Sequence, residues 1–210
     1  MSEVQAEKPR PDLLKWAIRG VALIGVAAVL YVIGASAFKS PAGEDGLADL
    51  SDLRRASLAK LDVPAEPRAM PTVGFTDADG KALTLADFKG EVVVLNLWAT
   101  WCAPCKKEMP TLAGLQAAYA TQPVKVLAVS VDRDDDLNIA KADIAAVPPL
   151  KLYRDPGYKL AFGLTPRAEG FPTTLIFDKQ GRERARLAGE ADWNSPEARE
   201  LVERLIREKS

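Results

Sequence analysis

The segment Val92-Val-Val-Leu-Asn-Leu-Trp98-Ala-Thr-Trp-Cys102-Ala-Pro-Cys105 is the strongest indicator of fold class in this 210-residue chain. Its first seven residues predict a strand buried on both faces, because apolar side chains occupy nearly every position. A helix from about Cys102 to Tyr119 is expected to follow, with Met109, Leu112 and Leu115 on one apolar stripe. A strand that delivers a Cys-x-x-Cys pair to the start of a helix is the arrangement that thiol-disulfide exchange requires.

The two cysteines of this pair are expected to play different roles. Cys102 falls where unpaired backbone N–H groups and the helix dipole favour a thiolate, so it is the predicted nucleophile. Cys105 lies on the same face of the first turn and can attack a mixed disulfide on Cys102, which makes it the resolving cysteine. Pro104 is tolerated between them because its missing N–H would have no helical partner.

Other uses of the cysteine pair fit the sequence less well. A tetrahedral zinc site needs four ligands, but the chain has two cysteines and no histidine, so such a site would have to be shared between chains. Lys106 stands where covalent haem attachment would need a histidine. A structural disulfide across so short a loop would constrain the unfolded chain very little.

The amino-acid composition argues against several other classes of function. The chain has 28 basic and 29 acidic residues, and this balance gives no indication of nucleic-acid binding. The absence of histidine argues against Ser-His and Cys-His hydrolases and against conventional copper or zinc centres. We therefore expect no metal and no cofactor, and the cysteines remain the obvious covalent groups.

The segment around the cysteines resembles a known family. Residues 96–110, Asn-Leu-Trp-Ala-Thr-Trp-Cys-Ala-Pro-Cys-Lys-Lys-Glu-Met-Pro, are similar to the active-site segment of TlpA-like and ResA-like thioredoxins. These are membrane-tethered thiol-disulfide oxidoreductases of the bacterial periplasm. Phe171-Pro-Thr-Thr174 resembles the loop with a cis proline that faces the cysteines in thioredoxin folds. Leu95 to Leu97 and Asp192-Trp193 are closer to TlpA, and the likeness covers roughly residues 71–207.

The resemblance implies further site residues. Phe171, Pro172 and Thr173 would bind the substrate, with the backbone of Phe171 offering main-chain partners. Glu108 matches a glutamate of the ResA-like active-site cavity and is the candidate proton handler, with a solvated helix carboxylate as the alternative. Asn96 stands where the general thioredoxin pattern has a buried aspartate.

The two tryptophans that flank the bend before Cys102 are assigned different roles. Trp98 is expected in the core. Trp101 is expected to line the docking surface beside the exposed sulfur, and Pro104 belongs to the same candidate surface.

The amino-terminal part predicts a membrane anchor. Residues 20–38 contain no charged residue and as a helix would span about 28 Å, enough to cross a bilayer. Basic residues precede this segment and acidic residues follow it, which places residues 1–19 in the cytoplasm and the rest outside. A signal peptide cleaved after Ala35-Ser-Ala37 is the alternative. A buried core helix fits less well, because the segment is apolar all round and contains small residues.

The remaining exported part divides into a linker and one domain. Residues 39–70 are expected to form a linker with an imperfect amphipathic helix, indicated by leucines from Leu47 to Leu61. Residues 71–210 are expected to form the thioredoxin-like α/β domain, with an opening β-hairpin at 73–85 and a central insertion of helix 138–146 and strand 150–153.

The later part of this domain yields four more expectations. Residues 124–131 predict a buried parallel strand. Asp132 to Asp136 reads as a solvated loop with helix capping, because a calcium loop would need spaced oxygen ligands and a glycine. Residues 175–187 predict a hairpin whose alternating Arg182, Arg184 and Arg186 keep a sheet edge soluble. Ser195-Pro196 is expected to open a last helix.

These features together predict a single-pass inner-membrane protein with its catalytic domain in the periplasm. The resemblance implies that it reduces disulfides in exported proteins of respiratory cytochrome biogenesis and is itself re-reduced by a membrane thiol carrier. The copper-site or copper-chaperone cysteines of haem-copper oxidase are the first expected target and apocytochrome c the second. A Cu(I) carrier that uses the cysteine pair is an alternative. A peroxidase is disfavoured because the Pro-x-x-x-Thr-x-x-Cys pattern is absent.

Overall fold

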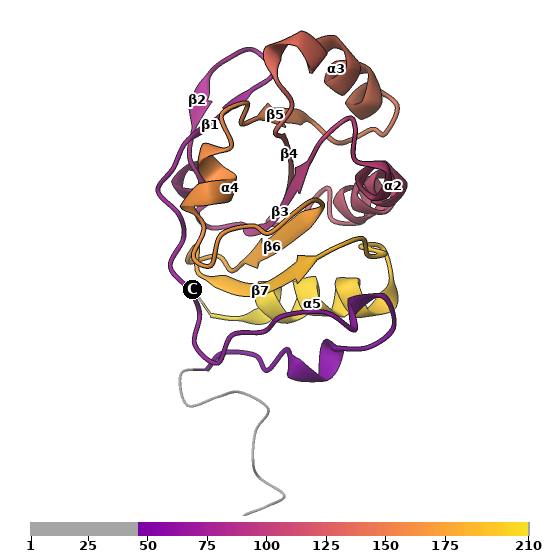
Figure 1. Cartoon of the computed structure of the whole chain (residues 1–210). Coiled ribbons are helices and arrows are strands. Elements are labelled where there is room, and N and C mark those ends of the chain that lie inside the picture. Colours follow the sequence, from indigo (N-terminus) through magenta and orange to yellow (C-terminus); the bar gives the residue numbers. More distant parts are fainter. Residues whose placement is uncertain (1–45, 210) are drawn as a thin grey trace, which may run out of the picture. The chain divides into compact units, whose positions relative to one another are not determined.

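A seven-stranded mixed sheet with helices on both faces forms the centre of the computed structural model, which describes residues 46–209 (Figure 1). The strand order is β2-β1-β5-β4-β3-β6-β7. The strands are β1 (Phe75–Asp77), β2 (Ala82–Leu83), β3 (Val92–Trp98), β4 (Val124–Ser130), β5 (Leu152–Arg154), β6 (Thr173–Phe177) and β7 (Glu183–Ala188). The α-helices are α2 (Ala103–Ala118), α3 (Leu137–Ala145), α4 (Lys159–Gly163) and α5 (Pro196–Arg207). Short 3-10 helices cover Ser51–Leu53, Ala56–Leu58, Leu85–Phe88 and Asp134–Asp136. The predicted α/β class, opening hairpin and central insertion are all present.

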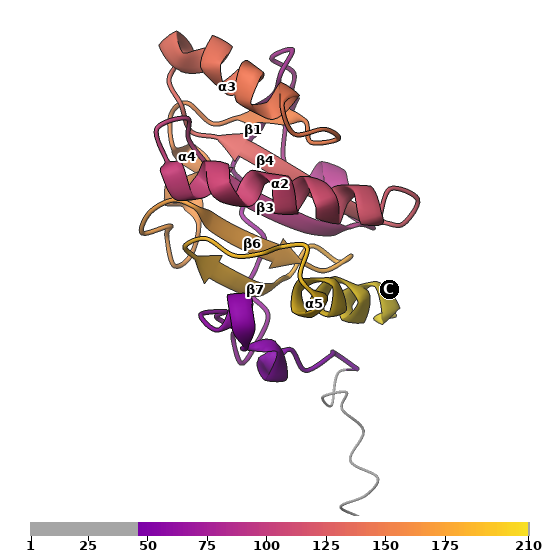
Figure 2. The same ribbon diagram turned by 90° about the vertical axis from the view of Figure 1, so that its right-hand side faces the viewer.

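Strand β3 organises both cores because all seven of its residues are buried. Val92, Val94 and Trp98 belong to the core that contains residues of α2, α3 and α5. The alternate residues Val93 and Leu95 belong to the core that contains residues of α4. Figure 2 shows α2, α3 and α5 together in front of the sheet with α4 behind it. The alternation follows from the two-residue period of a strand, which here buries apolar side chains on both faces.

The sheet register brings two loops to one end of the sheet. β3 runs parallel to β4 and antiparallel to β6, and Leu97 pairs with Thr173. The chain leaves β3 just before Cys102 and enters β6 just after Pro172. The cysteine pair and the proline loop therefore lie at the same end of two neighbouring strands.

The leucines ahead of residue 70 lie in two short 3-10 helices, so the expectation of one amphipathic helix is wrong. The five-residue gap between Leu53 and Leu58 breaks the helical period, and both side chains are buried in the α5-side core together with Leu50 and Leu61. Because all four leucines are buried, the segment forms two short turns along the surface of the domain in place of one continuous helix. The segment belongs to the same compact unit as the sheet.

The arginines of β7 are buried, and the prediction that they keep an open sheet edge soluble is wrong. Residues 62–68 run along β7, with antiparallel bridges of Asp62 to Arg186 and of Arg68 to Glu183. Arg186 donates to both carboxylate oxygens of the buried Glu183, at 2.9 and 2.8 Å. The edge is covered by the chain's own preceding segment, and the arginine charges are neutralised by carboxylates that the sequence pattern did not pair with them.

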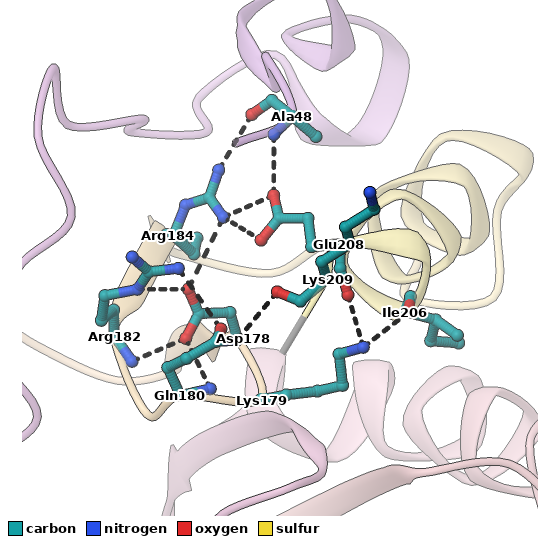
Figure 3. A network of polar contacts seen from close by, with 9 residues as sticks. All are labelled: Ala48, Asp178, Lys179, Gln180, Arg182, Arg184, Ile206, Glu208 and Lys209. Atoms are coloured by element: carbon teal, nitrogen blue, oxygen red, sulfur yellow. Dashed lines mark hydrogen bonds and ion pairs between the residues drawn. The ribbon is translucent and has the colours of Figure 1, made fainter. Parts of the chain in front are cut away.

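A second ionic cluster joins three distant parts of the chain (Figure 3). The Arg184 guanidinium forms a 2.5 Å ion pair with Glu208, just after α5, and donates at 2.9 Å to the carbonyl oxygen of Ala48. The Glu208 carboxylate also accepts the Ala48 N–H at 2.8 Å. Asp178 of the β6–β7 turn lies 3.6 Å from Arg184. The cluster fixes the first described residues to the end of the sheet opposite the cysteines.

The predicted anchor at residues 20–38 and the cytoplasmic segment at 1–19 lie outside the described residues. Within residues 46–209, the helices are too short or too polar to cross a bilayer.

Candidate active site

The cysteine pair lies at the junction of β3 and α2, as the sequence predicts. Cys102 and Cys105 form a disulfide, with 5.3 Å between their Cα atoms. Cys102 is the N-cap of α2, and its Sγ accepts the backbone N–H of Cys105 at 3.3 Å. Cys102 retains 5% exposure, whereas Cys105 is fully buried. An incoming group can therefore reach only Cys102, where the Cys105 N–H at the helix start is positioned to stabilise a thiolate.

Glu108 lies one turn beyond Cys105 on the same face of α2, and it is buried. Its Oε1 accepts the side-chain amide of Asn96 at 2.6 Å. Its Oε2 accepts the backbone N–H of Ala191 and the indole N–H of Trp193, each at 3.1 Å. The alternative of a solvated helix carboxylate is thus wrong, because β3 and the loop before α5 enclose the side chain.

Burial raises the pKa of Glu108 from 4.5 to about 7. The three hydrogen bonds lower the pKa, but they do not outweigh the loss of water around the carboxylate. Nearby Glu190 adds a smaller increase. A carboxyl group with a pKa close to neutrality can accept or return a proton at physiological pH, which is the property of a general acid-base group.

Asp132 holds the bend that leads into the cysteines, a role that the sequence did not indicate. Its carboxylate accepts the backbone N–H of Thr100 at 2.9 and 3.0 Å and the Thr100 hydroxyl at 2.9 Å. It also accepts the Ser130 hydroxyl at 2.7 Å. The expectation of a solvated acidic run is wrong for Asp132, which is buried, and holds for Asp134 and Asp135, which are exposed. The position of Asp132 just after a strand parallel to β3 was the available signal.

The proline loop has the predicted cis peptide bond between Phe171 and Pro172. In the described part of the chain, the backbone of Phe171 makes no backbone hydrogen bond. Its ring contacts Trp101 edge to face, with 5.9 Å between the ring centroids. Trp101 is 62% exposed, and Pro104 is also exposed. Thr173 is buried, and its hydroxyl donates to the Gly170 carbonyl at 2.7 Å. The side chain of Thr173 is therefore not available to a substrate, and only the backbone of this residue remains a candidate for substrate contact.

Two residues that support Glu108 were not assigned site roles from the sequence. Thr174 accepts the second N–H of the Asn96 amide at 2.9 Å, which fixes that amide beside Glu108. Trp193 is buried and donates to Glu108 from 85 positions further along the chain. The likeness of Asp192-Trp193 to TlpA was the one sequence signal for Trp193. Trp98 lies in the core, as predicted.

A helix that begins at a Cys-x-x-Cys disulfide, beside a cis-proline loop of a neighbouring strand, defines a thioredoxin-like thiol-disulfide oxidoreductase. The sequence profile of the AhpC/TSA family matches residues 67–185. The chain belongs to this family.

Individual relatives agree with this class. Thiol-disulfide oxidoreductase ResA of Bacillus thuringiensis subsp. konkukian is 36% identical over 124 residues, covering 57% of this chain and 68% of the relative. ResA of Bacillus subtilis (strain 168) is 29% identical over 165 residues, covering 78% of each chain. The expected resemblance to ResA-like thioredoxins is confirmed, whereas the closer likeness to TlpA stays a prediction.

Solved structures support the fold. A DsbF homologue from Corynebacterium diphtheriae superimposes with a TM-score of 0.57 at 27% identity, over 69% of this chain and 90% of the other. A putative thiol:disulfide interchange protein DsbE from Chlorobium tepidum gives a TM-score of 0.53 at 26% identity, over 69% and 96%. The predicted thioredoxin-like fold is therefore confirmed for the described domain.

Proposed function

We propose that this oxidoreductase works as a reductant of disulfides in exported proteins. The observation that carries the proposal is the buried carboxyl group of Glu108, one helical turn beyond Cys105 on α2. A carboxylate at this place disfavours a neighbouring thiolate, and a less stable thiolate makes the dithiol a stronger reductant. The Cys102 thiolate attacks the substrate disulfide, forming a mixed disulfide and releasing one substrate thiolate.

Resolution of the mixed disulfide needs the second cysteine to lose its proton. Cys105 is fully buried and has no contact with bulk solvent that could take that proton. Glu108, with its pKa near 7, accepts it. The Cys105 thiolate then attacks Cys102, the second substrate thiolate leaves, and the Cys102–Cys105 disulfide forms. A dithiol carrier, proposed to lie in the membrane, then reduces the Cys102–Cys105 disulfide by supplying two electrons and two protons, and is itself oxidised to a disulfide.

The proposed setting is the periplasmic side of the inner membrane, with residues 20–38 as the anchor. Disulfides of exported proteins persist in that compartment, where they need a dedicated reductant. The proposed substrates are proteins of respiratory cytochrome biogenesis, foremost the copper-site or copper-chaperone cysteines of haem-copper oxidase. The resemblance to ResA and TlpA supports this choice.

The mechanism is tested by two cysteine variants in the full chain. Cys102→Ser is expected to abolish disulfide reduction, whereas Cys105→Ser is expected to accumulate mixed disulfides, since attack persists without resolution. Non-reducing electrophoresis and mass spectrometry of species trapped in the periplasm would identify the substrates. Accumulation of mixed disulfides on Cys105 in the Cys102→Ser variant would contradict the assigned roles. Stoichiometric tight Cu(I) binding with poor reductase activity would favour a copper carrier instead.

The anchor is tested by topology. A reporter that is active only in the periplasm, fused after Ser40, is expected to be active and to stay with the membrane fraction. The same reporter fused after Arg19 is the control and should be inactive. Recovery of a soluble mature protein that starts near Phe38 would establish signal cleavage in place of anchoring.

A further inference from the structure

A row of aromatic side chains, half-buried in its middle and exposed at both ends, continues beyond the residues that adjoin the disulfide. Trp101 contacts Phe171, Phe171 contacts Tyr158 at a centroid distance of 6.1 Å, and Tyr158 stacks on Phe162 at 6.0 Å. We call these four residues the aromatic row. Trp101 and Phe162, at its two ends, are 62% and 61% exposed. One other large apolar side chain of the described residues, Ile139 on α3, is similarly exposed.

The far half of the row is held in place by buried groups. Leu160 and Ala161 of α4 are buried in the core on that face of the sheet, and helical spacing turns Phe162 outward. Asp155 is buried, and its carboxylate accepts the backbone N–H groups of Lys159 at 3.0 Å and Leu160 at 2.8 Å. α4 is thus a fixed support for an exposed aromatic ring.

Tyr158 occupies a backbone conformation that a tyrosine rarely adopts. Its φ is +57° and its ψ is +18°, in the left-handed region, and it is the residue that opens α4. Left-handed backbone in a bulky residue is unfavourable and persists where the surrounding structure imposes it. Hydrogen bonds on both sides impose it here, from Tyr158 N–H to the Asp155 carbonyl and from Phe162 N–H to the Tyr158 carbonyl. The conformation places the tyrosine ring between Phe171 and Phe162.

We propose that Tyr158 and Phe162 form a second contact site for the oxidised partner protein, continuous with the first contact at Trp101 and Phe171. The inference rests on the proposed function, because it assumes a protein disulfide brought to Cys102. The occupant is an extended segment of the partner that carries an aromatic or large aliphatic side chain near its reactive cysteine. Aromatic rings bind such side chains through apolar burial and edge contacts.

The length of the row limits where this side chain lies. Three ring contacts of about 6 Å each span at most about 18 Å, and an extended chain advances about 3.3 Å per residue. The partner side chain that reaches Phe162 is therefore at most about five or six residues from the cysteine. The free backbone of Phe171, midway along the row, can pair with the same extended segment.

A peptide series tests the inference with the reduced full chain. Each peptide carries one cysteine as its glutathione mixed disulfide and one phenylalanine, moved from one to six positions to either side in a glycine-serine background. For peptides with phenylalanine about five or six positions from the cysteine, we expect the wild-type kcat/KM to be about three to ten times that of the phenylalanine-free peptide. Phe162→Ala should lose this preference and keep the wild-type rate with glutathione disulfide.

Two further variants distinguish the loss of an aromatic contact from a disturbance of the fold. Tyr158→Asn removes the ring while keeping a residue that tolerates left-handed backbone, and should also lose the preference. Ile139→Ala, the control at an exposed apolar residue of α3, should retain it. Equal preference in wild type and Phe162→Ala, or an equal loss of rate with every substrate, would overturn the inference. A wild-type chain that reduced none of the disulfides would overturn the proposed function and this inference with it.

Discussion

The chemistry proposed for this site depends on the buried carboxyl group of Glu108. Three neighbouring groups donate hydrogen bonds to it. None of the groups that shift its pKa carries a positive charge. Such donors stabilise a carboxylate in the protein interior, but they offset only part of the free-energy cost of removing it from water. The result is a group that holds its proton up to about neutral pH and gives it up within the physiological range.

A raised pKa in the folded state has a defined effect on stability. Between pH 4.5 and about 7, folded Glu108 retains a proton that the unfolded chain has lost, so stability falls as pH rises through this window. The loss amounts to roughly 3 kcal/mol when the window has been crossed. Glu108→Gln should remove this contribution to the pH dependence, measured by denaturant unfolding of the oxidised protein from pH 4 to 8.

The same variant should impair exchange. Glu108→Gln keeps the size of the side chain but cannot accept a proton, so resolution by Cys105 is expected to slow about 10²-fold or more. Loss of the nearby negative charge should also lower the pKa of Cys102, measured by alkylation. Glu190→Gln is the control, because it removes an exposed neighbouring charge and leaves the buried carboxyl in place. Wild-type rates and an unchanged unfolding profile in Glu108→Gln would contradict the assigned role.

At the scale of elements, the bend between β3 and α2 depends on the neighbouring strand β4. The Asp132 carboxylate gathers four hydrogen bonds from Thr100 and Ser130 just before the chain reaches Trp101 and Cys102. Because β3 and β4 run parallel, their carboxyl ends meet at the same edge of the sheet. The acidic side chain that follows one strand can therefore hold the loop that follows the other.

Asp132→Ala should reveal this support. The change leaves the Thr100 N–H and two hydroxyl groups without their acceptor, and is expected to cost about 2 to 3 kcal/mol of unfolding free energy. The reduction rate should fall as well, since the segment that presents Cys102 loses its fixed position. Asp135→Ala, in the same acidic run but exposed, should change stability by less than about 0.5 kcal/mol. Similar losses in both variants would refute the special role of Asp132.

At the scale of the whole molecule, the two ends of the described chain close on each other. Ala48 and Glu208 meet at the guanidinium of Arg184, and leucines of residues 50–61 complete the core beside α5. The segment between the predicted anchor and the sheet is thereby part of the folded domain. The reaction centre lies at the opposite end of the sheet from this closure.

Glu208→Gln tests the closure. Arg184 is buried, so removal of the charge of its main partner leaves a guanidinium without adequate neutralisation, at an expected cost of about 3 kcal/mol. Glu203→Gln on the exposed side of α5 is the control and should cost less than about 1 kcal/mol. Thermal and denaturant unfolding of the two variants give the comparison. An equally small effect of both would show that the ionic cluster does not hold the chain ends.

The class of fold and the position of the cysteine pair could be predicted from the amino-acid sequence. The apolar run 92–98, the Cys-x-x-Cys pair and the Phe171-Pro172 loop each impose a local structure through burial, helix capping or backbone restriction. Such signals lie within a few residues of their consequence. The position of the Cys102–Cys105 pair and of the strand that precedes it could therefore be predicted from the sequence.

The environment of the polar groups could not be predicted in this way, because it depends on how the chain folds in three dimensions. Whether Glu108, Asp132 or Arg184 is solvated or buried depends on partners 30 to 140 positions away, such as Trp193, Thr100 and Ala48. Charged residues in sequence are consistent with an exposed loop, a sheet edge or a buried network alike. The free energy of a charged group is set by its surroundings in space, and these surroundings exist only once the sheet register and the packing of α5 have brought distant residues together.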